Sequence, residues 1–122
     1  MNPIKTYLHD GGRVGDGFAN EKLDCGVRAY AIAKGIPYYE AHEVFEKAGR
    51  LARHRTSWNI YTKIGIQFNQ TRMSLKKFLL THPKGSFYVC MRGHAFAVKD
   101  GVVFGNVRLS GRVVVKRWAE II

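Results

Sequence analysis

Apolar residues in the first part of the chain recur at the three- and four-residue spacing of amphipathic helices. Asp24 is a favoured N-cap residue, and the segment after it ends at Gly35, with Pro37 just beyond. This arrangement predicts a helix that begins at Cys25. The same spacing predicts three further helices, over residues 39–53, 58–64 and 75–81. Residues 1–19 contain glycines among polar residues and predict a loop or a short hairpin.

The last third of the chain changes to short runs of β-branched and aromatic residues that are typical of strands. Four strands are predicted, over residues 86–92, 94–99, 102–104 and 112–118. Asp100 and Gly101 give a strong hairpin signal between the second and third of them. Helices first and strands second predict an α+β fold, in which an N-terminal helical half packs on a C-terminal antiparallel sheet. A length of 122 residues fits one domain over residues 1–122.

Charge is the unusual feature of the composition. Twenty Lys and Arg residues stand against nine Asp and Glu residues, which gives a formal net charge of +11. Such a surface attracts polyanions, namely nucleic acid, anionic lipid or an acidic protein. The alternative is a solvated surface that only keeps the protein in solution. The residues considered for a basic partner surface are Arg50, Arg53, Arg55, Arg72, Lys76 and Lys77.

The sequence disfavours several classes of protein. No apolar run reaches the roughly 18 residues that span a bilayer, and the first ten residues lack the apolar segment of a signal peptide. We therefore expect a cytoplasmic protein without a membrane partner. Two cysteines, without CxxC or HExxH spacing, form neither a disulfide scaffold nor a zinc motif. We accordingly expect neither a metal nor another cofactor.

Cys25 and His94 are the candidate catalytic residues. A cysteine in the first turn of a helix lies near the positive end of the helix dipole, which favours the thiolate. A histidine brought alongside can form a thiolate–imidazolium pair, and the backbone N–H of Cys25 can donate to an oxyanion. Asn106 follows the predicted hairpin on a strand that returns beside His94, so it is the candidate that orients the imidazole. The alternatives are a small core residue at Cys25 and a turn residue at Asn106.

Two segments resemble the small papain-like cysteine peptidases. The segment from Asp24 to Ala33 looks like their nucleophile helix. Residues 85–101, with His94 between Gly93 and Ala95, look like the hairpin that carries their catalytic histidine. Similar compact forms occur among phage-encoded and bacterial proteins and in bacteriocin-processing peptidase domains. The resemblance extends over residues 20–106, which is most of the chain.

The resemblance implies a papain-like fold and thiol-dependent hydrolysis of an amide or related acyl bond without a cofactor. Cys25 would be the nucleophile, His94 the base and Asn106 the orienting residue. A polar residue ahead of the nucleophile would help to bind the oxyanion, and Asn20 is the nearest candidate. The implied function is that of a cysteine peptidase, isopeptidase or amidase with a protein or peptide substrate, for which the basic surface favours an acidic one.

Two other functions compete with hydrolysis. A catalytically inactive papain-like protein, for example a viral one in a host cytoplasm, would bind an acidic host protein through its basic surface. Direct binding of nucleic acid is the second alternative, and its affinity would fall steeply with salt. Hydrolysis requires Cys25 and His94 close together in an open cleft, whereas a binding protein does not. The sequence predicts no oligomeric state.

Overall fold

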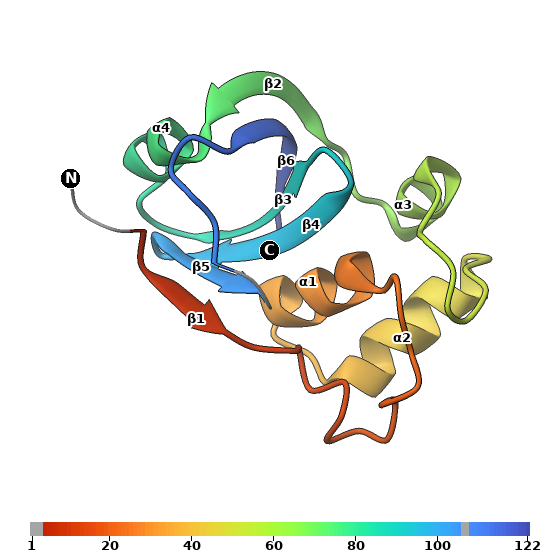
Figure 1. Ribbon diagram of the computed structural model, residues 1–122. Coiled ribbons are helices and arrows are strands. Elements are labelled where there is room, and N and C mark those ends of the chain that lie inside the picture. Colours follow the sequence, from red (N-terminus) through yellow and green to blue (C-terminus); the bar gives the residue numbers. More distant parts are fainter. Residues whose placement is uncertain (1–3, 106–107) are drawn as a thin grey trace.

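Four helices and six strands make up the part of the chain that the computed structural model describes, residues 4–105 and 108–122 (Figure 1). The helices are α1 (Cys25–Lys34), α2 (Tyr38–Lys47), α3 (Trp58–Ile64) and α4 (Leu75–Thr81). The strands are β1 (Thr6–Leu8), β2 (Asn69–Ser74), β3 (Ser86–Met91), β4 (His94–Lys99), β5 (Val102–Gly105) and β6 (Val114–Glu120). This composition confirms the α+β class that the sequence predicts.

The strands form one mixed sheet in the order β1-β5-β4-β3-β6-β2. Strand β1 pairs parallel to β5, and the other neighbouring pairs are antiparallel. The expectation of an antiparallel sheet built only from the C-terminal half is therefore wrong in two respects. The sheet is mixed, because β1 pairs parallel to β5, and its strands do not all follow the helices, since β1 precedes α1 and β2 lies between α3 and α4.

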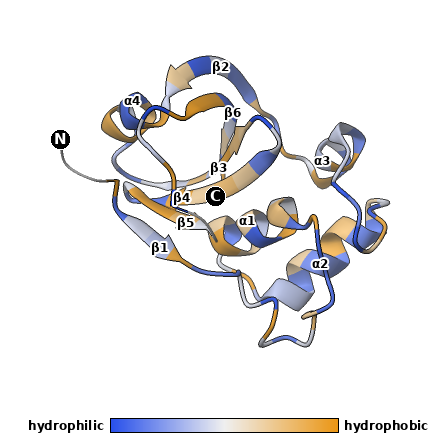
Figure 2. Cartoon of the chain, in the orientation of Figure 1, coloured by the Kyte–Doolittle hydropathy of each residue, from blue (hydrophilic) through white to orange (hydrophobic). Residues whose placement is uncertain are grey.

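The two strands missed from the sequence are both at the edges of the sheet. Strand β2 reads Asn-Gln-Thr-Arg-Met-Ser and has no alternation of apolar and polar residues. Figure 2 shows the contrast between its hydrophilic part and the hydrophobic interior strands β4 and β5. An edge strand needs no apolar pattern when its one neighbour supplies the hydrogen bonds, and here β6 does so.

The predicted second helix is too long at its C-terminal end. It was expected over residues 39–53, but α2 ends at Lys47. Gly49 adopts a φ of 112°, and the N–H of Arg50 returns to the carbonyl of Phe45, so the chain leaves the helix here. The following segment to Ser57 is a connection without regular structure. Within the described residues, no helix combines the length and apolar character needed to cross a membrane.

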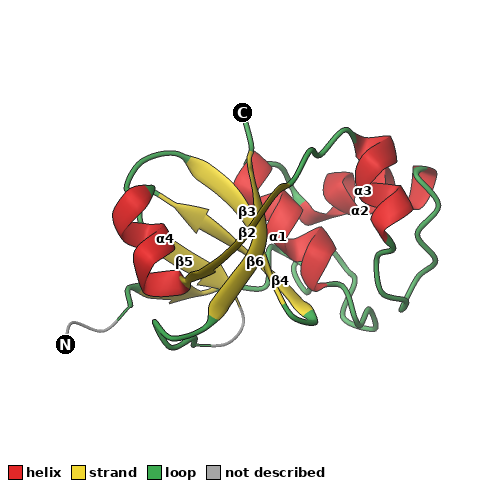
Figure 3. Ribbon diagram, turned by 90° about the horizontal axis from the view of Figure 1, so that it is seen from above, coloured by secondary structure: helices red, strands yellow, loops and turns green. Residues whose placement is uncertain are grey.

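The sheet has two faces with different covers, which Figure 3 shows from above. Alternation along β3 sends Tyr88 and Cys90 to one face and Phe87 and Val89 to the other. Helix α1 covers the first face and packs closely on β4. Helix α4 covers the second face, where Phe78 is fully buried. The candidate site lies on the face that α1 covers.

Candidate functional site

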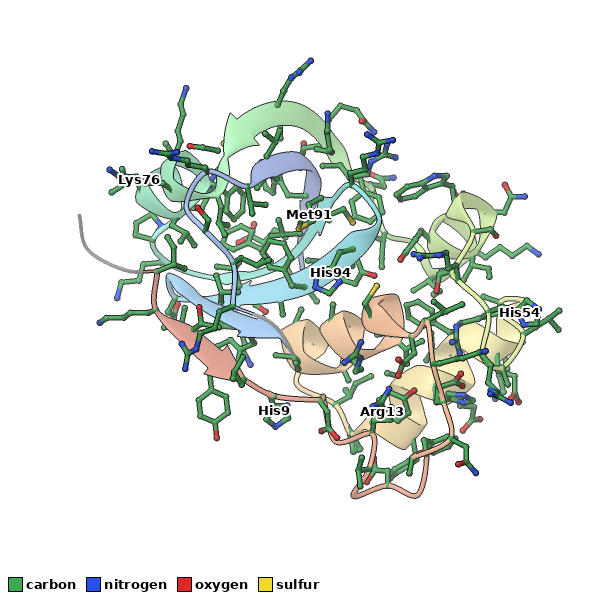
Figure 4. All side chains as sticks on the ribbon, in the orientation of Figure 1. His9, Arg13, His54, Lys76, Met91 and His94 are labelled. Atoms are coloured by element: carbon green, nitrogen blue, oxygen red, sulfur yellow. The ribbon has the colours of Figure 1, made fainter. Side chains whose placement is uncertain are left out.

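Cys25 and His94 are brought together by the packing of α1 on β4. Cys25 is the first residue of α1 and His94 is the first residue of β4. Figure 4 shows the labelled ring of His94 between these two elements. Both side chains line a hollow of about 190 Å³, which we call the thiol cleft. The other residues of the thiol cleft include Leu23, Arg55, Trp58, Tyr61 and Met91.

A second, narrower hollow lies on the other side of the same two residues. Its lining includes His9 and Arg28, together with Cys25 and His94. Cys25 and His94 therefore lie between two depressions, and both residues are partly exposed. The structure agrees with the sequence in bringing this pair to one place.

The imidazole of His94 is held in a desolvated position. Burial lowers its pKa below the usual 6.5, and the positive charge of Arg28 lowers the pKa further. Within the described residues, its buried Nε2 has no hydrogen-bond partner, and no hydrogen bond joins the ring to Sγ of Cys25. A lowered pKa means that the ring is neutral at pH 7. Neutral imidazole is the form that accepts a proton.

Asp24 precedes the candidate nucleophile and is fully buried. The sequence predicts it as the N-cap, but its carboxylate does not cap α1. It accepts hydrogen bonds from the Tyr38 hydroxyl at 2.8 Å and from Arg13 at 3.2 Å, and it pairs with Arg28 at 3.4 Å. The first turn of α1 therefore keeps N–H groups that Asp24 does not use, beside the thiol of Cys25.

A second buried carboxylate anchors the approach to α1. Both oxygens of Glu21 accept hydrogen bonds from Arg50, each at 3.2 Å, and Nε2 of His42 lies 2.8 Å from one of them. Burial raises the pKa of Glu21, but the bonds from Arg50 and His42 outweigh this effect and lower it to about 2. Arg50 is only 3% exposed, so its prediction as part of a basic partner surface is wrong. A pairing 29 residues apart in sequence gives no local signal.

Two buried tyrosine hydroxyls fix the position of the first turn of α1. Tyr61 and Tyr88 share a hydrogen bond of 2.8 Å, and Tyr88 donates to the carbonyl of Gly26 at 3.1 Å. A Cβ on Gly26 would lie 2.6 Å from the Tyr61 hydroxyl oxygen, which is closer than real contacts allow. Only glycine fits next to Cys25 at this depth. Sequence reasoning missed this role, because neither tyrosine is near Gly26 in the chain.

The two cysteines of the chain differ in their surroundings. Both are free thiols, and Cys25 is half-buried whereas Cys90 is only 5% exposed. Burial raises the pKa of Cys90 to about 12, despite the opposing charge of Arg117. Cys90 also lines the thiol cleft, but it is nearly fully buried, so Cys25 is the more exposed of the two thiols there.

The other predicted site residues lie outside this pair. Asn20 is exposed in a turn and lines neither hollow, and its part in binding an oxyanion stays a prediction. Asn106 falls outside the described residues. Arg53 and Arg55 are exposed between α2 and α3, whereas Arg72, Lys76 and Lys77 are exposed on β2 and α4. Figure 4 shows these two regions at opposite ends of the molecule, marked by His54 and Lys76.

The candidate site is a cleft between α1 and β4. It contains the half-buried thiol of Cys25 and the neutral imidazole of His94, and the charge of Arg28 acts on that ring. Among residues 4–105 and 108–122, no group of three or more His, Cys, Asp or Glu side chains is arranged to hold a metal ion. No model of a known protein family, no curated protein and no solved structure matches the chain. The residues of the cleft are thus the basis for assigning a function.

Proposed function

We propose that the protein is a thiol-dependent hydrolase of the papain-like class, with Cys25 as nucleophile and His94 as base. The observation that carries the proposal is that a helix-start thiol and a neutral imidazole line the same open cleft. A helix that presents a cysteine, packed on a sheet that presents a histidine, also supports the papain-like assignment.

In the proposed reaction, Sγ of Cys25 attacks the carbonyl carbon of the scissile amide while His94 accepts the thiol proton. The oxyanion of the tetrahedral intermediate binds the free N–H groups of the first turn of α1. His94 then protonates the leaving amine, and the C–N bond breaks to give a thioester on Cys25. Water attacks the thioester, with His94 accepting its proton, and the released thiol recovers that proton.

The low pKa of His94 favours general-base catalysis over a preformed ion pair. The imidazolium form of His94 is disfavoured by burial and by the positive charge of Arg28, so the neutral ring is its resting form. The rate of acylation should therefore increase with pH through a value below 6.5, where His94 loses its proton, and then level off. Asn106 remains the proposed orienting residue, as the sequence predicts.

The proposed substrate is a peptide or isopeptide with acidic residues near the scissile bond. No carboxylate lines the thiol cleft, and Arg55 stands at its wall. The two free thiols support a reducing compartment such as the cytoplasm.

Acylation by p-nitrophenyl acetate tests the proposal without a known substrate. We expect a burst of p-nitrophenol and an acetyl group on Cys25 by mass spectrometry. The burst rate should fall at least roughly 100-fold in His94→Ala, the usual scale of general-base catalysis. Cys90→Ala is the matched control and should keep the wild-type burst. Equal burst rates in wild type and His94→Ala would exclude His94 as base.

A non-catalytic binding domain is the second candidate function. The observation in its favour is that no hydrogen bond within the described residues joins Cys25 to His94. The same burst assay separates the two functions, because a binding domain would show slow acylation that is insensitive to both Cys25→Ala and His94→Ala.

A further inference from the structure

The positive charge of the chain is concentrated in its second part. After Glu46, only two acidic residues occur, Asp100 and Glu120, whereas fifteen of the twenty Lys and Arg residues lie there. Ion pairs within the described residues engage only Lys47 and Arg50 of these fifteen. In the part of the chain that the structure describes, the other thirteen cations form no ion pair with a carboxylate, and such an excess of positive charge attracts polyanions.

Strand β2 runs through this positive region as an edge of the sheet. It leads from α3 to α4, and β6 is its one neighbour (Figure 1). Gln70 lies opposite Arg117 of β6 in the register, and the pairing is irregular between Gln70 and Met73. Arg72 is exposed at this irregularity. A six-residue strand is roughly 20 Å long. Strand β2 therefore forms a track, an extended edge that runs from the side of Arg53 and Arg55 toward Lys76 and Lys77 on α4.

An aromatic platform stands at the start of this track. Trp58 is 52% exposed although it is one of the largest apolar side chains. Tyr61 and Phe68 contact its ring at centroid distances of 5.3 and 5.9 Å, which fixes its orientation. The guanidinium carbon of Arg117 lies 3.9 Å from the ring centroid. The result is a rigid stack of indole and guanidinium at the surface.

A groove of about 390 Å³ joins the platform to β2. Its lining includes Trp58, Arg117 and the amides of Gln67 and Gln70, and it includes no carboxylate. We call it the Trp58 groove. Aromatic and guanidinium planes accept stacked bases, cations accept phosphates, and amides bond to base edges; together they are the parts from which single-strand binding sites are built.

We propose that the Trp58 groove and strand β2 form a binding site for single-stranded nucleic acid, in which bases stack on the Trp58–Arg117 platform and phosphates follow Arg72. An acidic polypeptide would satisfy the charge but would leave the exposed aromatic platform unused. A duplex would keep its bases stacked on one another and away from Trp58. The site does not depend on the chemistry of Cys25.

The test is binding of fluorescein-labelled dT12, followed by anisotropy at several salt concentrations. We expect binding to wild type with an affinity that falls as salt increases. Arg72→Gln should weaken binding roughly fivefold at low salt and reduce the salt slope by about 0.7, the value for one lost phosphate contact on a single strand. Lys22→Gln is the matched control, because Lys22 is an exposed cation before Glu46, and it should bind as wild type does.

Trp58 variants test stacking separately from charge. Trp58→Ala should lose roughly tenfold in affinity with an unchanged salt slope, and Trp58→Phe should recover most of the loss, as base stacking requires. Thermal unfolding of each variant checks that the fold is kept. If Trp58→Ala is unstable, Arg72→Gln serves as the second variant, because it replaces an exposed guanidinium by an amide. Equal losses in Arg72→Gln and Lys22→Gln would overturn the location of the site.

Two competitors test the class of ligand. A labelled peptide of twelve glutamates that binds as tightly as dT12 would overturn the proposal in favour of an acidic protein, and tighter binding of a 12-base-pair duplex would overturn it in favour of double-stranded nucleic acid. Cys25→Ala should bind dT12 as wild type does. A failed acylation assay with intact dT12 binding would remove the hydrolase alone, and the converse result would remove this site alone.

Discussion

The two faces of the sheet are built from different kinds of core. Among the described residues, the buried side chains on the face covered by α4 are apolar, such as Phe78, Val89 and Phe96. The face covered by α1 combines apolar contacts with the hydroxyls of Tyr61 and Tyr88 and the thiol of Cys90. Buried polar groups are costly unless they are bonded, and each such bond requires a fixed geometry. The α4 face therefore contributes stability, and the α1 face fixes the positions of specific groups.

The position that the α1 face fixes is that of the segment before Cys25. Glu21 and Asp24 are both buried, and each bonds to more than one side chain from another part of the sequence. A protein that needed only a stable core could replace such groups by apolar ones. These two carboxylates lie next to the candidate nucleophile. Among the described residues, the α4 face has no buried carboxylate.

The largest expected effect is on the α4 face. Phe78→Ala removes a fully buried ring that contacts Phe87 and Trp118, and it should lower the free energy of unfolding by about 4 kcal/mol. Urea denaturation measures this loss. The acylation rate of Cys25 in the folded variant should not change, because the helix α4 lies across the sheet from the thiol. A tenfold slower rate would show that the two faces are coupled.

Glu21→Gln should break the anchor on the α1 face. The guanidinium of Arg50 would then be buried without its counter-charge, which costs about 3 kcal/mol. The acylation rate should decrease as well, because the segment before Cys25 loses its anchor. Glu43→Gln removes a carboxylate from an exposed pair with Lys47 and is the matched control, with no expected change in the urea midpoint.

The same carboxylate predicts a pH dependence of stability. The pKa of Glu21 is about 2 in the folded chain against 4.5 as its ordinary value, so the unfolded chain binds more protons between these values. The stabilisation from Glu21 is therefore complete above pH 4.5 and is lost as the pH decreases toward 2. Urea midpoints of wild type and Glu21→Gln should converge over this range. A constant difference would contradict the role of the charge.

Gly26→Ala should lower the free energy of unfolding by less than Glu21→Gln does. This is the opposite of the usual effect of alanine in a helix, which is to stabilise it. Alanine normally stabilises a helix interior relative to glycine by about 1 kcal/mol. Here the added methyl would meet two buried hydroxyl oxygens, at 2.6 and 2.8 Å, that already bond to each other. We expect a net loss of about 2 kcal/mol by urea denaturation. Restored stability in Gly26→Ala combined with Tyr61→Phe would identify the Tyr61 hydroxyl as the obstacle.

The smallest expected effect concerns Cys90. Cys90→Ala removes one buried sulfur and should cost about 1 kcal/mol. Native wild-type protein should take up one equivalent of iodoacetamide, on Cys25, and two equivalents after denaturation. Mass spectrometry counts the adducts. Two native adducts would show that Cys90 is accessible and that the two thiols are not distinguished as the structure implies.

Local patterns in the sequence predict the elements that are governed by neighbouring residues. The hairpin at Asp100 and Gly101 is present between β4 and β5, and helices α1, α3 and α4 lie where apolar spacing places them. The edge strands β1 and β2 could not be predicted, because the partner strand rather than their own composition makes them strands.

The candidate site follows the same division. The sequence can place Cys25 and His94 close together, because each has a local signal, a helix start for one and a hairpin for the other. The burial of Arg50 and the non-capping role of Asp24 were not found, because their partners Glu21 and Tyr38 are far away in the chain or across a loop. The electrostatics of a buried network depends on tertiary contacts that no spacing rule contains.

One exposed hydrogen bond joins two residues that line the thiol cleft. Arg55, in the connection before α3, donates to the carbonyl of Gly93, in the turn between β3 and β4, at 3.2 Å. A single exposed bond of this kind contributes about 1 kcal/mol, so an opening that broke only this bond would be populated by roughly one molecule in six. Loop motions of this type take nanoseconds to microseconds. The cleft would then open and close faster than substrate molecules arrive. The rate of substrate entry would therefore be limited by diffusion and by steric fit.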